Sequence, residues 1–323
     1  MPRDGHSHPT LERRPASRSW AKDAAVALSF RASRALVRQP FGDNLKQILW
    51  RRIVRPYIGW RPYQSRAMTV FGAQFDCTLK DYIQQMLLYF GVWEPNITGF
   101  IASRLREGDC FVDVGSNIGY YAVLASRLVG PAGKVVAIEA SPWIYATLRR
   151  HIDINGCTNI RALNIAASDH QGMMRLFSGP DHNCGMTSTL PSRGLDFECE
   201  VMADRLDAIL SPTEMQSARL VKIDVEGAEA PVLDTIVETI GRYFADVEFI
   251  VEINQPELCH FGVTAQTIID RFAAIGFNAY LLNNDYAPAA YWRRVPRARP
   301  IRVYRLTEEL SDVVFSRRDA ETL

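Results

Sequence analysis

The sequence predicts an α/β fold built on a mostly parallel sheet with helices on both faces. From residue 109 onward, short apolar runs alternate with segments whose apolar residues recur at helical spacing. Gly, Asp and Asn bound the short runs, which favours strands over buried helices. Strands that alternate with helices form parallel sheets covered on both sides. The 323 residues are 47% hydrophobic and 23% charged, as in soluble globular proteins.

Each predicted element rests on a local pattern. Cys110–Gly115 is an apolar run closed by a glycine, and apolar residues then recur at helical spacing over 118–128. The same alternation continues to residue 306. Strands are predicted over 110–115, 134–139, 159–165, 220–224, 247–253, 277–282 and 301–306, and helices over 118–128, 142–154, 233–240 and 264–275.

Composition divides the chain into four parts. A basic arm, a cap segment, a main domain and a tail are predicted over 1–66, 67–108, 109–306 and 307–323. The arm is expected to be partly disordered and to form an N-terminal helical extension over 21–38. The cap segment holds a predicted helix over 81–90, which Gly91 would end.

The net charge of +1 hides an asymmetry between the arm and the body. Residues 1–66 hold 14 basic and four acidic side chains, a net charge of +10, so the remaining 257 residues carry −9. An acidic body has the wrong sign to bind nucleic acid through its phosphates, so no such partner is expected. The arm could contact an anionic membrane surface or an acidic partner, although a solvated basic helix is the simpler interpretation.

The cysteine pattern and the N-terminal composition predict a cytoplasmic protein. No two of the six cysteines form a C-x-x-C pair, and no histidine cluster has zinc-ligand spacing. We therefore expect reduced thiols and no metal. The apolar segment 24–30 is short, is followed at once by Arg31 and precedes no convincing signal cleavage site. The oligomeric state stays open.

The loop after the first strand has the character of a nucleotide-binding turn. Asp113, Gly115 and Gly119 form the pattern Asp-x-Gly-x-x-x-Gly, which lacks one glycine of dinucleotide folds. Glu139 ends the next strand, where a carboxylate can accept hydrogen bonds from two ribose hydroxyls. An acid beside the loop would repel a pyrophosphate but would suit a ligand with an ammonium and a sulfonium group. The pattern favours S-adenosylmethionine over NAD, and a glycine turn without a ligand is a third possibility.

The chain between about 75 and 255 resembles the FkbM family of S-adenosylmethionine-dependent methyltransferases. The matching runs are Asp81–Ile83, Gly91–Pro95, Gly108–Gly119, Val136–Pro142, Asn155–Gly156, Ala166–Asp169 and Val221–Glu229. Ser116 stands where the family usually has alanine. The resemblance implies a Rossmann-like class I methyltransferase fold with a seven-stranded sheet, and methyl transfer usually to oxygen.

The resemblance also implies a set of cofactor-binding residues. They are Glu94, Asp113, Gly115, Ser116, Asn117, Gly119, Glu139, Ala140, Ser141, Asp169 and Asp224. The residues of the first loop would line the methionine part, and Glu139 would hold the ribose, with Ala140 and Ser141 alongside. Asp169 would reach the adenine amino group, unless it caps a helix. Asp224 would lie beside the reacting methyl group.

Methyl transfer to an alcohol also needs a group that accepts the hydroxyl proton. Asp224 and Glu226 are two residues apart at a strand end, so both carboxylates are expected to point into one pocket. His260 follows the fifth strand and is the third catalytic candidate, although a lone loop histidine is more often structural. Glu229 is more simply explained as an acid at a helix N-terminus.

Two further segments border the expected pocket. Residues 179–195, which include His182 and Thr187–Thr189, form either a substrate lid or a plain surface loop. Trp93 and Glu94 either fold over the cofactor or serve as a core aromatic residue and a helix cap.

The function expected from these features is methylation of a hydroxyl group on a sugar, glycolipid or secondary metabolite. Three alternatives stay open: an N-methyltransferase acting on a small molecule, a non-catalytic protein that binds S-adenosylmethionine, and a membrane-associated adaptor that uses the basic arm. The sequence does not distinguish among acceptors.

Overall fold

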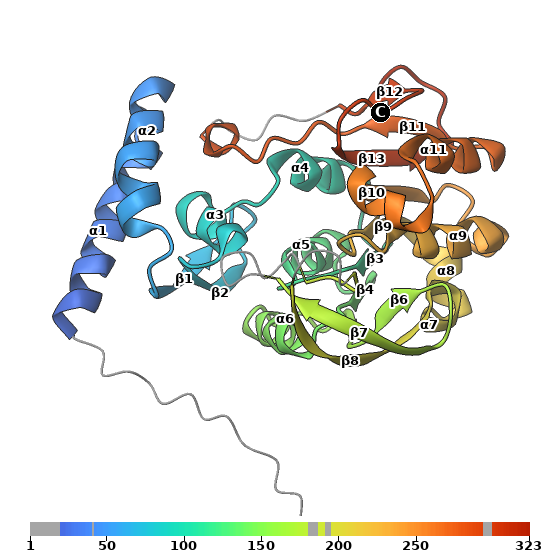
Figure 1. Cartoon of the computed structure of the whole chain (residues 1–323), viewed down its shortest axis with the longest axis horizontal. Helices are drawn as coiled ribbons and strands as arrows, with labels where there is room; N and C mark the ends of the chain where they lie inside the picture. The colour runs from blue at the N-terminus through green and yellow to red at the C-terminus, as the bar shows by residue number, and fades with distance from the viewer. Residues whose placement is uncertain (1–19, 41, 180–186, 191–194, 293–298) are drawn as a thin grey trace, which may run out of the picture.

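The computed structural model describes residues 20–40, 42–179, 187–190, 195–292 and 299–323. Its centre is an eight-stranded sheet, visible at the right of Figure 1. In sheet order the strands are β12 (Ile301–Val303), β11 (Asn278–Leu281), β13 (Leu310–Ser316), β10 (Glu248–Asn254), β9 (Ala218–Ile223), β3 (Cys110–Val114), β4 (Lys134–Ile138) and β5 (Ile160–Leu163). The five strands from β10 to β5 run parallel, and β13 is antiparallel to both its neighbours. The predicted α/β class is confirmed, and β13 adds a strand to the seven expected.

Helices cover both faces of this sheet. One side carries α4 (Pro95–Arg104), α5 (Tyr120–Val129) and α6 (Pro142–Ile154), and the other carries α7 (Leu206–Ile209), α8 (Pro212–Ser217), α9 (Glu229–Thr239), η4 (Ile240–Arg242) and α11 (Ala265–Ala274). Phe111 and Val135 enter the first core, whereas their neighbours Val112 and Val136 enter the second. Successive strand residues point to opposite faces, which is why buried parallel strands are apolar at every position.

The N-terminal segment is helical and packs against the first core. It comprises α1 (Trp20–Arg38), α2 (Asp43–Leu49) and η1 (Trp50–Ile58), a π-helical segment, followed by the hairpin β1 (Gln64–Met68) and β2 (Gln74–Thr78) and by α3 (Tyr82–Phe90). The ring of Tyr89 lies 5.2 Å from that of Phe30 and 5.0 Å from that of Trp50. Gly91 ends α3 with φ +75°, as the sequence predicts, and the Asp81 side chain caps the start of the helix.

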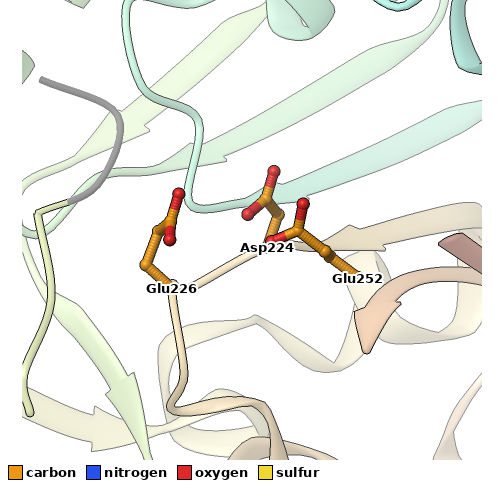
Figure 2. Close-up of side chains that lie close together, drawn as sticks. All are labelled: Asp224, Glu226 and Glu252. Atoms are coloured by element: carbon orange, nitrogen blue, oxygen red, sulfur yellow. The ribbon is translucent and has the colours of Figure 1, made fainter. Parts of the chain in front are cut away.

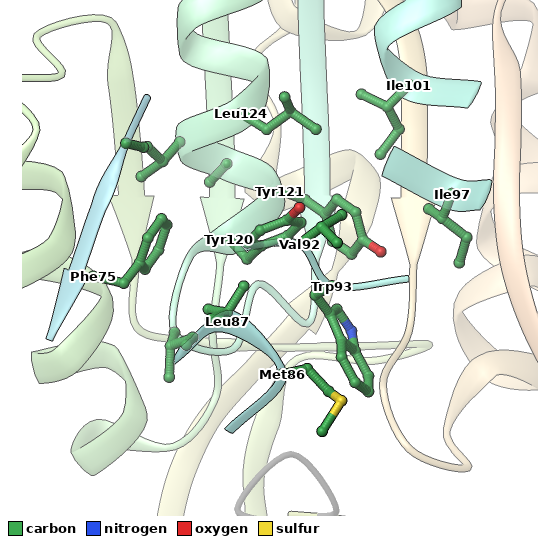
Figure 3. Packing of buried hydrophobic residues seen from close by; sticks show 14 of the residues in the cluster. Phe75, Met86, Leu87, Val92, Trp93, Ile97, Ile101, Tyr120, Tyr121 and Leu124 are labelled. Carbon is green, nitrogen blue, oxygen red and sulfur yellow. The ribbon is translucent and has the colours of Figure 1, made fainter. Parts of the chain in front are cut away.

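Packing between α3 and α5 fixes two side chains that matter for function. Figure 3 shows Met86 and Leu87 of α3 in one cluster with Trp93 and the tyrosines of α5. The rings of Tyr120 and Tyr121 lie 5.1 Å apart and nearly perpendicular, a favourable aromatic geometry. Because aromatic side chains bury large apolar areas, this cluster holds Trp93 and Tyr121 in fixed positions at the edge of the sheet.

A second, three-stranded sheet was not predicted. It consists of β6 (Ala166–Ser168), β8 (Asp196–Arg205) and β7 (Gly172–Ser178), with β7 and β8 antiparallel. Leu176 and Val201 are buried on its inner face, whereas Met173 and Met202 are exposed. Apolar residues on both faces obscure the alternation that would identify a half-buried strand.

Glu214 of α8 joins the edge of the main sheet to the second helical layer. Its carboxylate is buried and accepts from Arg161 of β5 at 2.5 Å and from Lys134 of β4 at 2.8 Å. Burial opposes the charged form, but these hydrogen bonds prevail and lower the pKa of Glu214 to about 2. The Ser211 hydroxyl and the Glu214 carboxylate also form a capping box at the start of α8.

Two of the predicted domain boundaries separate segments that pack together in the structure. The tail over 307–323 contains β13, whose residues Val313, Val314 and Phe315 are fully buried between β10 and β11. This short apolar run supplies the antiparallel strand, whereas 301–306 yields only the three-residue edge strand β12. The arm and the cap segment are also continuous, since β1 begins at Gln64. The predicted disorder before α1 falls on residues 1–19, outside the described part of the chain.

Short helical segments complete the chain at the carboxyl ends of the strands. They are α10 (Gln255–Leu258), η5 (Cys259–Phe261) and η6 (Pro288–Tyr291). None of the described helices combines the length and the apolar character needed to cross a bilayer. The cysteines at 77, 110, 157, 199 and 259 are free thiols, and Cys184 lies outside the described residues.

Candidate active site

A cavity of about 430 Å³ opens at the carboxyl ends of four central strands. Gly115, Glu139, Asp224 and Asn254, at the ends of β3, β4, β9 and β10, all line it. This edge of an open α/β sheet is where such folds bind ligands. The volume lies within the range of small-molecule sites, which is about 300–1,000 Å³.

The loop between β3 and α5 is held in place by its backbone. The N–H groups of Gly115 and Ser116 both donate to the carbonyl of Ile138 at 2.9 Å, which joins the loop to β4. Gly115 has φ +82°, and a Cβ there would lie 1.7 Å from the backbone oxygen of Asp224. Only glycine fits this position. The Ser116 hydroxyl donates to the Asp113 carbonyl at 2.8 Å, so the departure from alanine adds a local hydrogen bond.

Glu139 is oriented by two backbone donors. Its Oε2 accepts from the Asn117 N–H at 2.8 Å, and its Oε1 accepts from the Ser141 N–H at 2.9 Å. Burial raises the pKa of Glu139 to about 7, although both hydrogen bonds oppose the shift. Each carboxylate oxygen keeps a further lone pair for a ligand hydroxyl. Ala140 lines the cavity, whereas Ser141 is fully buried, does not line it and acts by positioning Glu139.

Asp113 lies behind the cavity wall and does not line it. It is fully buried, and neither carboxylate oxygen has a hydrogen-bond partner among the described residues. Burial raises the pKa of Asp113 to about 6, against the opposing charge of Lys222, its register partner on β9. Direct contact of Asp113 with the methionine part stays a prediction. An incompletely compensated buried acid favours a cation in the neighbouring cavity.

Three carboxylates converge on the other side of the cavity, as Figure 2 shows. Oxygen atoms of Asp224, Glu226 and Glu252 all lie within 4.8 Å of one another. The Lys222 ammonium donates to Asp224 at 2.7 Å. Burial, and then the charges of Asp224 and Glu226, raise the pKa of Glu252 well above its usual range. The sequence suggested no such compact cluster. It offers oxygen ligands of the kind a divalent cation accepts, and the absence of a metal stays a prediction.

Glu94 closes the cavity from the N-terminal side. It precedes α4 in the left-handed conformation, with φ +39°, and its side chain does not cap that helix. Its carboxylate instead accepts from the hydroxyls of Tyr121 at 2.5 Å and Tyr286 at 2.9 Å, and from the Asn284 amide at 3.1 Å. Tyr286 also donates to Glu252 at 3.4 Å. Glu94 therefore lines the pocket and connects it to the acidic cluster.

Besides Asp113 and Ser141, three predicted residues lie outside the cavity wall, and two of these three point to solvent. Asp169 has a side chain 55% exposed, accepts from the His170 ring and does not line the cavity, so its contact with the adenine stays a prediction. The chain turns outward after β6, and Ile165 and Ala167 line the cavity instead. His260 is on η5, with its side chain 46% exposed and 3.9 Å from Glu257, and it does not line the cavity, so its role as the base stays a prediction.

Gly119, the third of these predicted residues outside the cavity wall, has a packing role. It adopts φ +87°, and a Cβ would lie 2.4 Å from a methyl carbon of Leu148 on α6. The close neighbour of Gly119 is therefore α6. The glycine therefore fixes the distance between two helices of the same layer.

Part of the predicted lid lies against the cavity. Thr187 and Thr189 line it, and the Ser188 hydroxyl donates to the backbone carbonyl of Glu226 at 2.6 Å. The backbone of Ser188 also pairs with Phe177 at the end of β7. His182 lies outside the described residues.

Sequence reasoning missed four tyrosines that line the cavity: Tyr82, Tyr120, Tyr121 and Tyr286. Tyr121 is in the first turn of α5, directly after the loop that holds Asn117, so its position at the start of that helix could have placed it beside the cavity. Tyr286 lies in a segment beyond the family resemblance, and no local pattern identifies it.

The charge of the wall matches S-adenosylmethionine. The charged residues among the described lining are the carboxylates Glu94, Glu139, Asp224, Glu226 and Glu252, and the single ammonium of Lys222. Such a surplus of negative charge in a low-dielectric site favours a ligand with a sulfonium and an ammonium group. It disfavours a pyrophosphate, which would need cations or free helix N-terminal amides. The residues present therefore fit this methyl donor.

Comparison with known proteins points to the same chemistry. The family model of the methyltransferase FkbM domain matches residues 113–279, more than half of the chain. The 31-O-demethyl-FK506 methyltransferase FkbM of Streptomyces tacrolimicus is 29% identical over 160 residues, which cover 40% of this chain and 60% of that protein. The protein-L-isoaspartate O-methyltransferase of Ignicoccus hospitalis is 37% identical over 71 residues, 21% of this chain and 34% of that protein. The chain thus spans from about a third to three fifths of these relatives.

Solved structures with a similar chain path include M. jannaschii TYW2 in complex with AdoMet, with a TM-score of 0.40 and 13% identity over 80% of this chain and 88% of that one. Another is Aeropyrum pernix fibrillarin with bound S-adenosyl-L-methionine, with a TM-score of 0.39 and 12% identity over 80% and 95%. The match to the family model, with the fold and the cavity, confirms the predicted family, fold and methyl donor. The chain belongs to the FkbM family of S-adenosylmethionine-dependent methyltransferases.

Proposed function

We propose that the protein methylates a hydroxyl group on a sugar, glycolipid or secondary metabolite. The observation that carries the proposal is that one cavity holds both the ribose-type carboxylate Glu139 and the acidic cluster of Asp224, Glu226 and Glu252. A donor site and a group able to accept a proton therefore share one enclosed space.

The donor side of the cavity would bind and orient the cofactor. When bound, S-adenosylmethionine supplies a methyl group on a positively charged sulfur, which is a good leaving group. Gly115 and Asn117 would bring the backbone close to the cofactor, Glu139 would accept from the ribose hydroxyls, and Asp224 would face the positive end. Positioning of this kind can lower a barrier by about 7–11 kcal/mol when the reacting groups are aligned.

The acceptor side removes a proton. An alcohol has a pKa far above 7, so its oxygen becomes a good nucleophile only as the proton leaves. One oxygen of Asp224 is occupied by Lys222, which leaves Glu226 and Glu252 nearest to an incoming hydroxyl. Burial raises the pKa of Glu252, which makes its carboxylate a stronger base. Glu226 and Glu252 are the proposed proton acceptors, with Tyr286 orienting Glu252.

The test is a labelled-methyl transfer screen with the full chain. Sugar, glycolipid and secondary-metabolite acceptors are each paired with the amine analogue and with the analogue whose hydroxyl is already methylated. A labelled methyl ether on the free hydroxyl is expected. Methylation of the amines alone would overturn the oxygen assignment and favour an N-methyltransferase.

Binding of the donor is measured separately by calorimetry. Tight binding without transfer to any acceptor would favour a non-catalytic binder. Absence of binding would overturn the donor site itself.

A further inference from the structure

A second cavity, of about 550 Å³, lies between the N-terminal helices and the segment around η6. Its walls are mainly aromatic and apolar, and include Trp50, Trp60, Tyr82, Tyr286, Pro288 and Trp292. The indole N–H of Trp292 is buried and has no hydrogen-bond partner among the described residues. The proposed methyl transfer leaves this cavity without a role.

The two cavities share a wall. Tyr82 and Tyr286 line both of them, and the Tyr82 hydroxyl donates to the Tyr286 carbonyl at 2.5 Å. On its other side, the Tyr286 hydroxyl reaches Glu94 and Glu252. The second cavity therefore adjoins the side of the active site that holds the proposed proton acceptors, the side an acceptor must occupy.

Two arginines stand at the rim of the second cavity. Arg51 and Arg55, on η1, line it and are exposed. No carboxylate among the described residues forms an ion pair with either. Two guanidinium groups one helical turn apart, beside an apolar space, suit a phosphate attached to a hydrocarbon chain.

The helices that carry the two arginines also expose apolar and basic side chains. Leu45, Ile48 and Tyr57 of α2 and η1 are more than half exposed, and Arg52, between them in the sequence, is exposed as well. Exposed apolar side chains interleaved with arginines are typical of surfaces that lie on anionic membranes. A ligand with a hydrocarbon chain and a phosphate would be presented to the cavity at such a surface.

We propose that the second cavity receives the hydrocarbon chain of a phosphate-bearing lipid acceptor, whose phosphate Arg51 and Arg55 bind. The acceptor's reacting group then extends past the Tyr82–Tyr286 wall into the active site. This inference rests on the proposed function, since it names the acceptor class of that same site. It also explains why the N-terminal helices pack beside the methyltransferase fold.

The test uses the full chain and alkyl phosphates of six, eight and ten carbons, below the concentrations at which they form micelles. Binding is followed by calorimetry without methyl donor, so a failure of the catalytic proposal does not affect this result. Affinity should rise about fourfold per added methylene, equivalent to about 0.8 kcal/mol. Inorganic phosphate that binds as well as decyl phosphate would overturn the proposal.

Charge variants locate the phosphate site. Arg51→Glu with Arg55→Glu should weaken decyl phosphate binding at least tenfold, because two charge-assisted contacts are lost. Arg52→Glu is the matched control, since Arg52 is exposed on the same segment but does not line the cavity. Equal losses in both variants would show a general electrostatic effect and refute the site. S-adenosylmethionine affinity, unchanged in each, verifies the fold.

A cavity-filling variant independently tests the proposed site for the hydrocarbon chain. Ala289→Trp places a large side chain in the second cavity and should abolish the dependence on chain length. Retained dependence in this variant would contradict the assignment. Binding to phosphatidylglycerol vesicles without binding to any alkyl phosphate would mean that these helices form only a membrane-docking surface, and would also overturn it.

Discussion

Cofactor binding should depend on pH through Glu139. Burial raises the pKa of this carboxyl from 4.5 to about 7, so near neutral pH about half of the cofactor-free protein carries it protonated. Ribose hydroxyls donate to the charged form, and a protonated carboxyl loses one acceptor oxygen. The affinity for S-adenosylmethionine should therefore rise with pH and level off above the pKa.

The size of the effect is set by the pKa. The deprotonated fraction of a group with a pKa of about 7 rises from about 9% at pH 6 to about 91% at pH 8, so affinity should rise about tenfold. The direction of the pH dependence follows from two opposing effects on the Glu139 carboxylate. Burial disfavours its charged form in the free protein, whereas the bound cofactor favours it. Because the pKa of Glu139 is raised in the free protein, ionising its carboxyl lowers the free energy of unfolding, by about 3 kcal/mol once the pH exceeds 7.

Calorimetric titrations at pH 6, 7 and 8 measure the dependence. Other buried acids titrate in the same range, with pKa values of about 6 for Asp113 and about 7 for Glu229. Glu139→Gln is the control that isolates one group, since it keeps the size of the side chain. It should bind more weakly and lose most of the slope. An identical slope in the wild type and in this variant would refute the role given to Glu139.

Three further outcomes are expected from other parts of the molecule. Gly115→Ala should abolish cofactor binding in calorimetry, because the new Cβ would meet the Asp224 carbonyl. Gly156→Ala is the control and should leave binding intact, since Gly156 also has a positive φ, +62°, but has open space around it. Equal losses of binding in the two variants would attribute the effect to backbone strain alone. Glu226→Gln should lower kcat by at least about 100-fold with little change in cofactor affinity, and parallel losses would exclude a substrate-side role. Glu214 has a folded pKa of about 2, so its stabilising contribution should disappear in melts as the pH falls from about 4.5 to 2, and Glu214→Gln should not show that loss.

The central strands and the donor half of the site could be predicted from the sequence. Cys110–Val114 is almost wholly apolar and Lys134–Ile138 is apolar after its first residue, which is the pattern of strands buried on both faces. Because these strands pair in parallel, Gly115 and Glu139, the residues directly after them, lie side by side at one edge of the sheet.

The acceptor half depends on contacts between segments far apart in the chain. Glu94 and Tyr286 are separated by 192 residues, and only the fold brings the two side chains within hydrogen-bond distance. Asp169 and His260 each come after a strand, yet their side chains are about half exposed and do not line the cavity. Position after a strand indicates an edge of the sheet, but the direction of the side chain depends on the next turn.

The same strand pairing that builds the core also sets the charge of the site. Asp113 and Lys222 are register partners on β3 and β9, and Lys222 also pairs with Asp224. Burial opposes the charge on Lys222, but the acids around it prevail and raise its pKa, so the lysine stays protonated. One ammonium cannot neutralise the several buried carboxylates that surround it, so the rest must hold protons or face another cation. A phosphate-free, positively charged donor meets that requirement, which is why a fold shared with dinucleotide-binding proteins selects a different ligand here.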